Sequence, residues 1–246
     1  DHYVVNGAKM FITSGMRADW TTVAVRTGGP GAAGVSLLGI ERDTPGFSRT
    51  ELKKMGWWAS DTAELHFDDC RVPASNLIGA EGQAFPLIMR NFNGERLTLA
   101  ASACGAAQAC LEDAVAWARE RKTFGQPLIA HQVIRHKLVD MVERIEATRA
   151  LLDDLAARLD AGEPPSPRGG EGRGEGQNLV AQTAMAKNYA ARTMQFCADA
   201  AVQILGGSGY MRGVRVERIY REVKVMMIGG GAEEVLKDLA ARQLGF

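Results

Sequence analysis

Two places in this sequence carry groups suited to proton transfer and to the binding of a ligand oxygen. Glu95 lies in a run with the apolar spacing of a helix, and its neighbours Phe92 and Leu97 are apolar. A glutamate on a helix is most often solvated, but partial burial here would raise its pKa toward the range of a general base. The glycines at 229–231 precede a predicted helix, so their backbone N–H groups could bind a ligand oxygen. A plain flexible loop is an equally good interpretation of these glycines.

Two further stretches carry groups suited to a phosphate. Arg121 opens the segment Arg-Lys-Thr-Phe-Gly between two predicted helices, where a guanidinium suits a pyrophosphate. A solvated helix end with basic residues is the plain alternative. Gly206 and Gly207 follow a predicted helix. They could allow close approach of the backbone to a phosphate or to the edge of a flavin ring, or they could form an ordinary helix C-cap and turn.

The composition excludes several classes of protein. The chain has 246 residues, of which 46% are hydrophobic and 24% charged, so it has enough apolar surface to offset the entropy of ordering a globular fold. Basic and acidic residues both number 29, and this zero net charge argues against a nucleic-acid partner. No apolar run reaches the length of a membrane span, so no membrane partner is expected.

The four cysteines are scattered and form no Cys-x-x-Cys pair. This pattern argues against a zinc site or a disulfide scaffold, so we expect no metal and a cytoplasmic location. The chain shows no signal peptide and opens inside a strand-like run at 3–7 without an initiating methionine. We therefore expect it to be a piece of a longer protein.

The elements that must position these groups fall into two parts. Short apolar runs between turn clusters predict strands at 23–25, 35–40 and 64–69, typical of a small β-sandwich or barrel. Beyond Gly79 the apolar spacing changes to three and four residues, which predicts helices. These helices are expected at 85–110, 134–159, 190–204 and 216–225, with a last one from about 233.

The predicted fold class is therefore α+β. Residues 1–78 are expected to form part of a β domain, and residues 79–246 an all-α helical bundle. The stretch 163–177 is rich in proline, glycine and charge, and we expect a mobile loop insertion without chemistry there.

Four motifs, taken together, resemble the acyl-CoA dehydrogenase family. They are Asn-Gly-Ala-Lys-Met-Phe-Ile-Thr-Ser-Gly at 6–15, Arg-Lys-Thr-Phe-Gly at 121–125, Gln-Ile-Leu-Gly-Gly at 203–207 and Arg-Glu-Val-Lys at 221–224. Members of this family have an N-terminal helical domain, a middle β domain and a C-terminal four-helix domain that builds a tetramer. The resemblance implies that this chain is the later part of the β domain followed by the C-terminal bundle.

The resemblance also implies an FAD site. Phe11, Ile12 and Thr13 would lie against the flavin ring, with the Thr13 hydroxyl at its N5/O4 edge. Arg121 and its neighbours would reach the pyrophosphate and adenosine of FAD in a neighbouring subunit, which implies a homo-oligomer, either a dimer or a tetramer. The residues assigned to FAD in this way are Phe11, Ile12, Thr13, Arg121, Phe124, Gln132, Gln203, Gly206, Gly207 and Glu234.

The resemblance implies an unusual position for the catalytic base. Most members carry Tyr-Glu-Gly-Thr before the last helix, where this chain has Gly-Gly-Gly-Ala, so Gly230 stands in place of the glutamate. A minority, including isovaleryl-CoA and long-chain acyl-CoA dehydrogenases, carry the base on the first long helix of the C-terminal domain, at the position of Glu95. Gly230 would keep its backbone N–H for the substrate carbonyl. Glu233 and Glu234 are rival carboxylates, expected to cap the last helix.

Substrate contacts follow from the same resemblance. Arg96 would lie near the CoA phosphates and the acyl entrance, and Gly229 would leave extra room beside the acyl chain. The implied reaction is dehydrogenation of an acyl-CoA thioester to a trans-2-enoyl-CoA: the base takes the α-proton and the flavin takes the β-hydride. Electrons would pass to an electron-transfer flavoprotein. An acyl-CoA oxidase-like flavoenzyme and a truncated, flavin-free oligomeric module are the alternatives, and short branched, long and isoprenoid-type acyl chains all fit the sequence.

Overall fold

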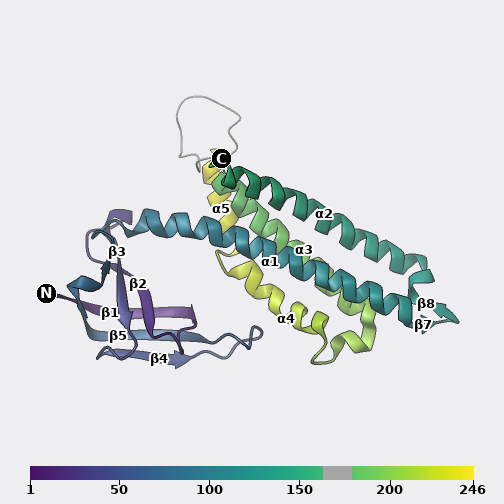
Figure 1. Cartoon of the computed structure of the whole chain (residues 1–246), viewed down its shortest axis with the longest axis horizontal. Coiled ribbons are helices and arrows are strands. Elements are labelled where there is room, and N and C mark those ends of the chain that lie inside the picture. Colours follow the sequence, from purple (N-terminus) through teal and green to yellow (C-terminus); the bar gives the residue numbers. More distant parts are fainter. Residues whose placement is uncertain (163–178) are drawn as a thin grey trace. The chain divides into compact units, whose positions relative to one another are not determined.

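Strands form the first part of the chain and helices the second in the computed structural model, which describes residues 1–162 and 179–246 (Figure 1). The contacts divide the chain into two units, Asp1–Asn91 and Phe92–Phe246. The predicted α+β class is confirmed. The insertion at 163–177 lies outside the described residues.

Two antiparallel three-stranded sheets build the first unit. One has the strand order β1-β5-β4 and the other β2-β3-β6. Within the described residues the two sheets remain open and do not close into a barrel. The strands are β1 His2–Thr13, β2 Trp20–Arg26, β3 Val35–Glu41, β4 Phe47–Glu51, β5 Thr62–Pro73 and β6 Leu77–Ile78.

Side chains from both sheets share one apolar core. Leu38 and Ile40 of β3 and Leu65 of β5 are fully buried in it. Phe67 of β5 stacks on Phe47 of β4, with ring centroids 4.8 Å apart. Because successive side chains of a strand point to opposite faces, this inward-facing set fixes the register of the strands.

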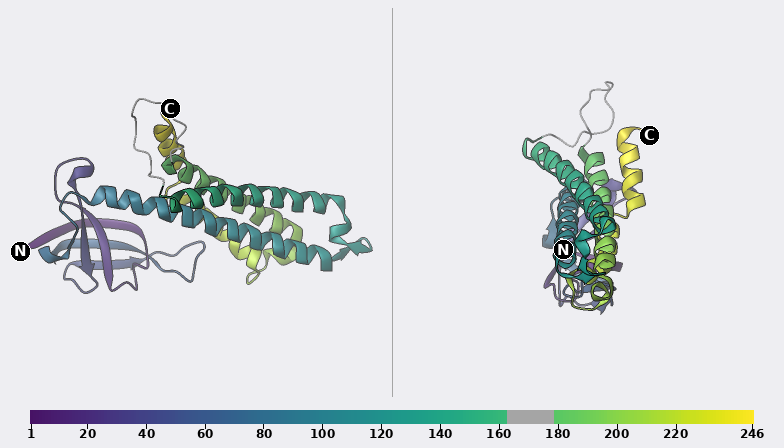
Figure 2. Two further views of the ribbon diagram at one scale, coloured as in Figure 1. Left: turned by 45° about the horizontal axis from the view of Figure 1, so that its top comes forward. Right: turned by 90° about the vertical axis from the view of Figure 1, so that its right-hand side faces the viewer.

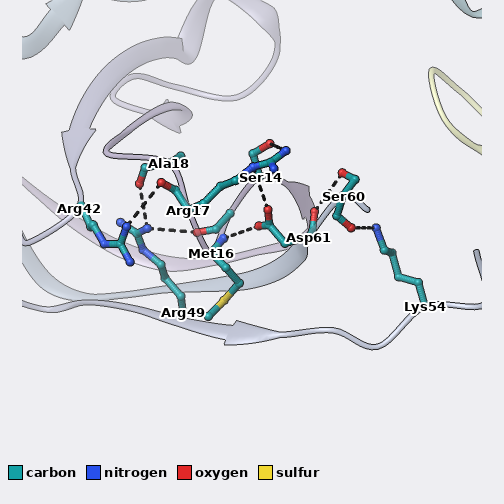
Figure 3. A network of polar contacts seen from close by, with 10 residues as sticks. Ser14, Met16, Arg17, Ala18, Arg42, Arg49, Lys54, Ser60 and Asp61 are labelled. Carbon is teal, nitrogen blue, oxygen red and sulfur yellow. Dashed lines mark hydrogen bonds and ion pairs between the residues drawn. The ribbon is translucent and has the colours of Figure 1, made fainter. Parts of the chain in front are cut away.

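The loop between β1 and β2 is held by charged side chains (Figure 3). The backbone N–H of Met16 donates to Asp61 Oδ2 at 2.7 Å, and Arg17 Nε lies 3.1 Å from Asp61 Oδ1. Arg49 of β4 donates from Nη1 to the carbonyl of Ala18 at 2.9 Å. These contacts fix the chain that leaves the end of β1.

Most of α1, four further helices and a small hairpin build the second unit. The helix α3 packs against α2, α4 and α5, and the long helices run side by side (Figure 2). Of the 27 residues of α3, 17 are buried and many of these are alanines, which let neighbouring backbones approach closely. The elements are α1 Ala84–Glu120, β7 Lys122–Thr123, β8 Gln126–Pro127, α2 Gln132–Asp160, α3 Leu179–Leu205, α4 Arg215–Ile228 and α5 Glu233–Leu244.

All four cysteines are buried free thiols. Burial raises the pKa of Cys110 and of Cys197 to about 12, so both are protonated near neutral pH. In residues 1–162 and 179–246, no three His, Cys, Asp or Glu side chains are grouped so that they could hold a metal ion. No helix in these same ranges is both long and apolar enough to cross a membrane.

The loop contacts of the first unit generate a stability prediction. Asp61→Ala removes a charge-assisted hydrogen bond and an ion pair, so we expect the free energy of unfolding to fall by about 1.5–3 kcal/mol. Asp19→Ala is the control, because Asp19 is 87% exposed and pairs with Arg42 only at 3.8 Å; we expect a loss below about 0.5 kcal/mol. Urea unfolding measures both, and equal losses would show that Asp61 does not hold this loop.

Candidate functional site

The glycine loop between α4 and α5 lies against α1. Arg96 of α1 donates from Nε to the carbonyl oxygen of Gly230 at 3.1 Å, and from Nη1 to Asn93 Oδ1 at 3.1 Å. Gly230 has φ +70°, and a Cβ atom built on it would lie 2.7 Å from Leu99 Cδ1. The loop therefore contacts the same turns of α1 that carry Glu95, so the two places singled out in the sequence for proton transfer and oxygen binding lie near each other.

Arg96 is 8% exposed, and this burial lowers the pKa of its guanidinium, although the neighbouring charge of Glu95 opposes the shift. Glu95 itself is exposed, so the partial burial considered from its apolar neighbours is not found. Consecutive helical residues point about 100° apart, and Arg96 is the one that faces the loop. The role of Arg96 in binding CoA stays a prediction; what the structure shows is that it supports the loop.

The other side of the loop is held by Lys187 of α3. Its Nζ donates to the carbonyl of Met227 at 3.0 Å and to that of Gly231 at 2.9 Å. The sequence analysis missed this residue. The one available signal was a single lysine within an alanine-rich helix, where neighbours such as Ala184 and Ala191 are buried.

The carboxylates at the start of α5 differ in their surroundings. Glu233 forms ion pairs with Arg192 and with Lys237, the latter at 3.3 Å. Glu234 is exposed beside it in the first turn of the helix. Both stand where the helix dipole favours negative charge. Gly229, in contrast, is half-buried and follows the last residue of α4.

Three of the predicted phosphate-side residues lie in or beside a short hairpin between α1 and α2. Phe124 and Gly125 form its turn with φ 54° and 82°, and Phe124 is 96% exposed. The ring of His131 lies edge-on to Phe124, with centroids 6.2 Å apart. Arg121 and Gln132 flank the hairpin with exposed side chains, and neither side chain bonds to any residue that the structure describes. The hairpin thus offers a cation, an aromatic ring and an amide to a ligand.

The end of α3 carries the remaining residues of this kind. Gln203, Gly206 and Gly207 are all exposed. A Cβ atom at either glycine would meet nothing within 4 Å, so the backbone surface there is open. Because α2 leads away from the hairpin and α3 returns, this end of α3 lies toward the hairpin (Figure 1).

The hairpin and Glu95 are far apart in one copy of the chain. Glu95 and Arg121 are separated by 26 positions (121 − 95) along α1 and the residue after it. At a rise of 1.5 Å per residue this corresponds to about 39 Å. A single dinucleotide is much shorter, so the two groups of residues cannot contact one such ligand within one copy.

The residues expected beside a flavin ring lie in the first unit, at the end of β1. Phe11 has φ 61° and is 76% exposed, at an irregularity of register between Lys9 and Ile12. A positive φ is uncommon for a bulky residue and often marks a functional position. Ile12 packs against the core and Thr13 is exposed, so this strand end presents a ring and a hydroxyl.

Family models match both units of the chain. Residues 1–70 match the acyl-CoA dehydrogenase middle domain, and residues 82–245 match the acyl-CoA dehydrogenase C-terminal domain. The chain belongs to the acyl-CoA dehydrogenase family. The resemblance inferred from four sequence motifs is thereby confirmed.

Individual acyl-CoA dehydrogenases are similar over the whole chain. The mitochondrial isobutyryl-CoA dehydrogenase of Dictyostelium discoideum is 38% identical over 99% of this chain and 56% of that protein. A putative acyl-CoA dehydrogenase structure from Mycobacterium smegmatis has TM-score 0.93 and 47% identity, over 100% of this chain and 61% of that one. A chain in a structure described as the electron transferring flavoprotein of Acidaminococcus fermentans has TM-score 0.88 and 35% identity, over 99% and 61%. The chain thus spans somewhat over half the length of its relatives.

The geometry of Gly230 generates a second stability prediction. Gly230→Ala places a Cβ at φ +70° and 2.7 Å from Leu99 Cδ1, so we expect a loss of about 1–3 kcal/mol in the free energy of unfolding. Gly207→Ala is the control, because its Cβ would meet nothing within 4 Å. Thermal and urea unfolding compare the two. A Gly230→Ala variant as stable as Gly207→Ala would mean that the loop adopts another backbone conformation.

Proposed function

We propose that this chain is part of an FAD-dependent acyl-CoA dehydrogenase, which converts an acyl-CoA thioester to the trans-2-enoyl-CoA. The observation that carries the proposal is the hydrogen bond between Arg96 Nε and the Gly230 carbonyl at 3.1 Å. It brings the loop that replaces the common base against the helix turns that carry Glu95. A carboxylate and a backbone donor are the two groups that abstraction of an α-proton requires.

In this mechanism Glu95 accepts the α-proton. That proton is only weakly acidic, so the thioester carbonyl must be polarised where negative charge develops. The backbone N–H of Gly230 is the proposed donor, and a backbone group is retained whatever side chain the position carries. Its φ of +70° suits glycine, and the bulk of Leu99 leaves little space for a side chain. Bound FAD supplies the acceptor for the β-hydride.

The described residues fit FAD by the chemistry of their donors. Exposed Arg121 and Gln132 have no partner among the described side chains, and Phe124 projects from the hairpin turn. A guanidinium suits a pyrophosphate, an aromatic ring stacks on adenine, and the open backbone at Gly206 and Gly207 admits a close approach. Phe11 and Thr13 are the proposed contacts of the flavin ring.

A homo-oligomer follows from the same proposal. Since Arg121 and Glu95 are separated by about 39 Å along α1, the hairpin of one copy would complete the FAD site of another. We propose a dimer or a tetramer assembled in this way. The apolar stripe of α2 at Leu138, Met141 and Ile145 is already buried within the bundle, so it is not the proposed contact.

The substrate and acceptor are proposed from the relatives. The similarity to isobutyryl-CoA dehydrogenase supports a short branched acyl-CoA. The similar chain in a structure of electron transferring flavoprotein supports that protein as the electron acceptor.

The base assignment is tested in the full-length protein with Glu95→Gln. We expect flavin bleaching by an acyl-CoA under anaerobic conditions to slow by about 10²–10⁴-fold, because a general base is removed. Flavin content and acyl-CoA affinity should be nearly unchanged. Glu112→Gln is the control, since this exposed carboxylate lies on the same helix as Glu95, and it should bleach at the parent rate. A normal rate for Glu95→Gln would overturn the assignment.

The cofactor assignment is tested with Arg121→Ala. Loss of a charge-assisted contact to phosphate costs about 1.5–3 kcal/mol, or roughly 10- to 150-fold in the dissociation constant of FAD. Lys122→Ala, a neighbouring exposed cation of the same hairpin, should change the constant by less than about threefold. Titration of the apoprotein with FAD gives both values. Equal affinities in the two variants would show that Arg121 is not the pyrophosphate ligand.

A further inference from the structure

Lys187 is a buried cation that the mechanism above does not use. It is 1% exposed on α3, and it forms no ion pair with any carboxylate in residues 1–162 or 179–246. Its Nζ instead donates to the carbonyls of Met227 at 3.0 Å and Gly231 at 2.9 Å. Met227 is in the last turn of α4 and Gly231 lies just before α5. One ammonium group therefore joins the two ends of the glycine loop.

This loop is the part of the proposed site most in need of external support. Three consecutive glycines have more backbone freedom than any other triplet, and ordering them costs the most entropy. Gly230 and Gly231 adopt φ +70° and +116°. Neither residue has a side chain whose contacts could hold the backbone at these values. A backbone N–H can serve as a preorganised donor only when its direction is fixed before the reaction.

The hydrogen bonds leave one peptide group of the loop for that purpose. Lys187 holds the carbonyls of Met227 and Gly231, and Arg96 holds that of Gly230. The N–H of Gly229 donates to Val225 at 2.7 Å. Four of the five peptide groups between residues 227 and 232 are thereby fixed. The fifth, between Gly229 and Gly230, carries the Gly230 N–H. The fixed groups on both sides hold its two Cα atoms, and the φ of +70° at Gly230 describes its direction.

We propose that Lys187 is a positioning residue for the reaction: its ammonium group fixes both ends of the glycine loop and so aims the Gly230 N–H at the substrate carbonyl. The inference rests on the proposed function, because it gives Gly230 the role of carbonyl donor. Arg96 braces the middle of the same loop from α1. The direction of the Gly230 N–H then depends on two cations, which bond to carbonyls of the loop and not to the N–H itself.

The free-energy cost of burying the charge of Lys187 indicates that this side chain does more than fill space in the bundle. Burial, reinforced by the charge of Arg96, lowers the pKa of Lys187 to about 8, so the charged form is costly there. An apolar side chain of similar length would avoid that cost. The negative end of the α4 dipole, represented by the Met227 carbonyl, offsets part of it.

The experiment uses the full-length protein with Lys187→Met, which removes the ammonium and keeps the length of the side chain. Thr193→Val is the matched control, because Thr193 is 1% exposed on the same helix and bonds Thr148 at 2.9 Å, away from the loop. Hydrogen exchange at residues 228–232 should become about tenfold faster or more in Lys187→Met and stay at the parent rate in Thr193→Val. The kcat should fall by about tenfold or more, with KM within about threefold and the FAD content unchanged.

Each outcome decides the inference. Parent-like exchange of the loop in Lys187→Met overturns it, whatever the activity. Faster exchange with an unchanged kcat also overturns it, since Lys187 would then be structural alone. A full-length parent that binds FAD but does not oxidise any acyl-CoA refutes the proposed function, and with it the catalytic part of the inference, while the exchange result still tells whether Lys187 holds the loop. Should Lys187→Met not fold, Lys187→Gln, which keeps a polar donor but removes the charge, is judged by the same measurements.

Discussion

Burial of positive charge against backbone carbonyls is the constraint on which the candidate site depends. Arg96 and Lys187 lie on different helices, and both direct their donors at the chain between α4 and α5. A buried cation without a carboxylate partner is expensive, and here its compensation comes from carbonyls at a helix end and in a loop. These hydrogen bonds connect α1 and α3 to the end of α4 and the loop after it. A shift of one of these helices would therefore break a charge-assisted hydrogen bond.

Helix α3 shows which part of the bundle a sequence pattern can reveal. The apolar spacing predicted α2 at 134–159, and the helix runs from Gln132 to Asp160. The third helix was predicted at 190–204 but begins at Leu179. Its first turns contain Ala181, Ala184 and Ala186, and all of them are buried. The buried faces of these turns are filled by small alanines and by the polar residues Thr183, Lys187 and Asn188, so they lack the stripe of large apolar residues on which the prediction relied.

The site illustrates the same limit. Glu95 and Gly230 could be singled out from the family pattern. Gly230 lacks the glutamate side chain that most members carry there, and Glu95 stands where a minority of members carry the base. Lys187 could not be singled out, since a lysine in a helix is ordinarily exposed and only the packing of the end of α4 beside it shows its role. The turn of the hairpin is similar: Phe124 adopts a positive φ, which the identity of the residue argues against, so local preference gave no indication of the hairpin.

The length of α1 has a consequence for what counts as the working unit. Arg96 and Leu99 of this helix lie against the glycine loop, and the C-terminal end of the helix leads into the hairpin. Glu95 and Arg121 are separated by about 39 Å, so in the proposed oligomer each chain would contribute half of two sites. Two chains damaged at opposite ends could then restore one intact site between them, whereas two chains damaged at the same end could not. In that proposed oligomer, dilution that separates the copies would leave each site incomplete.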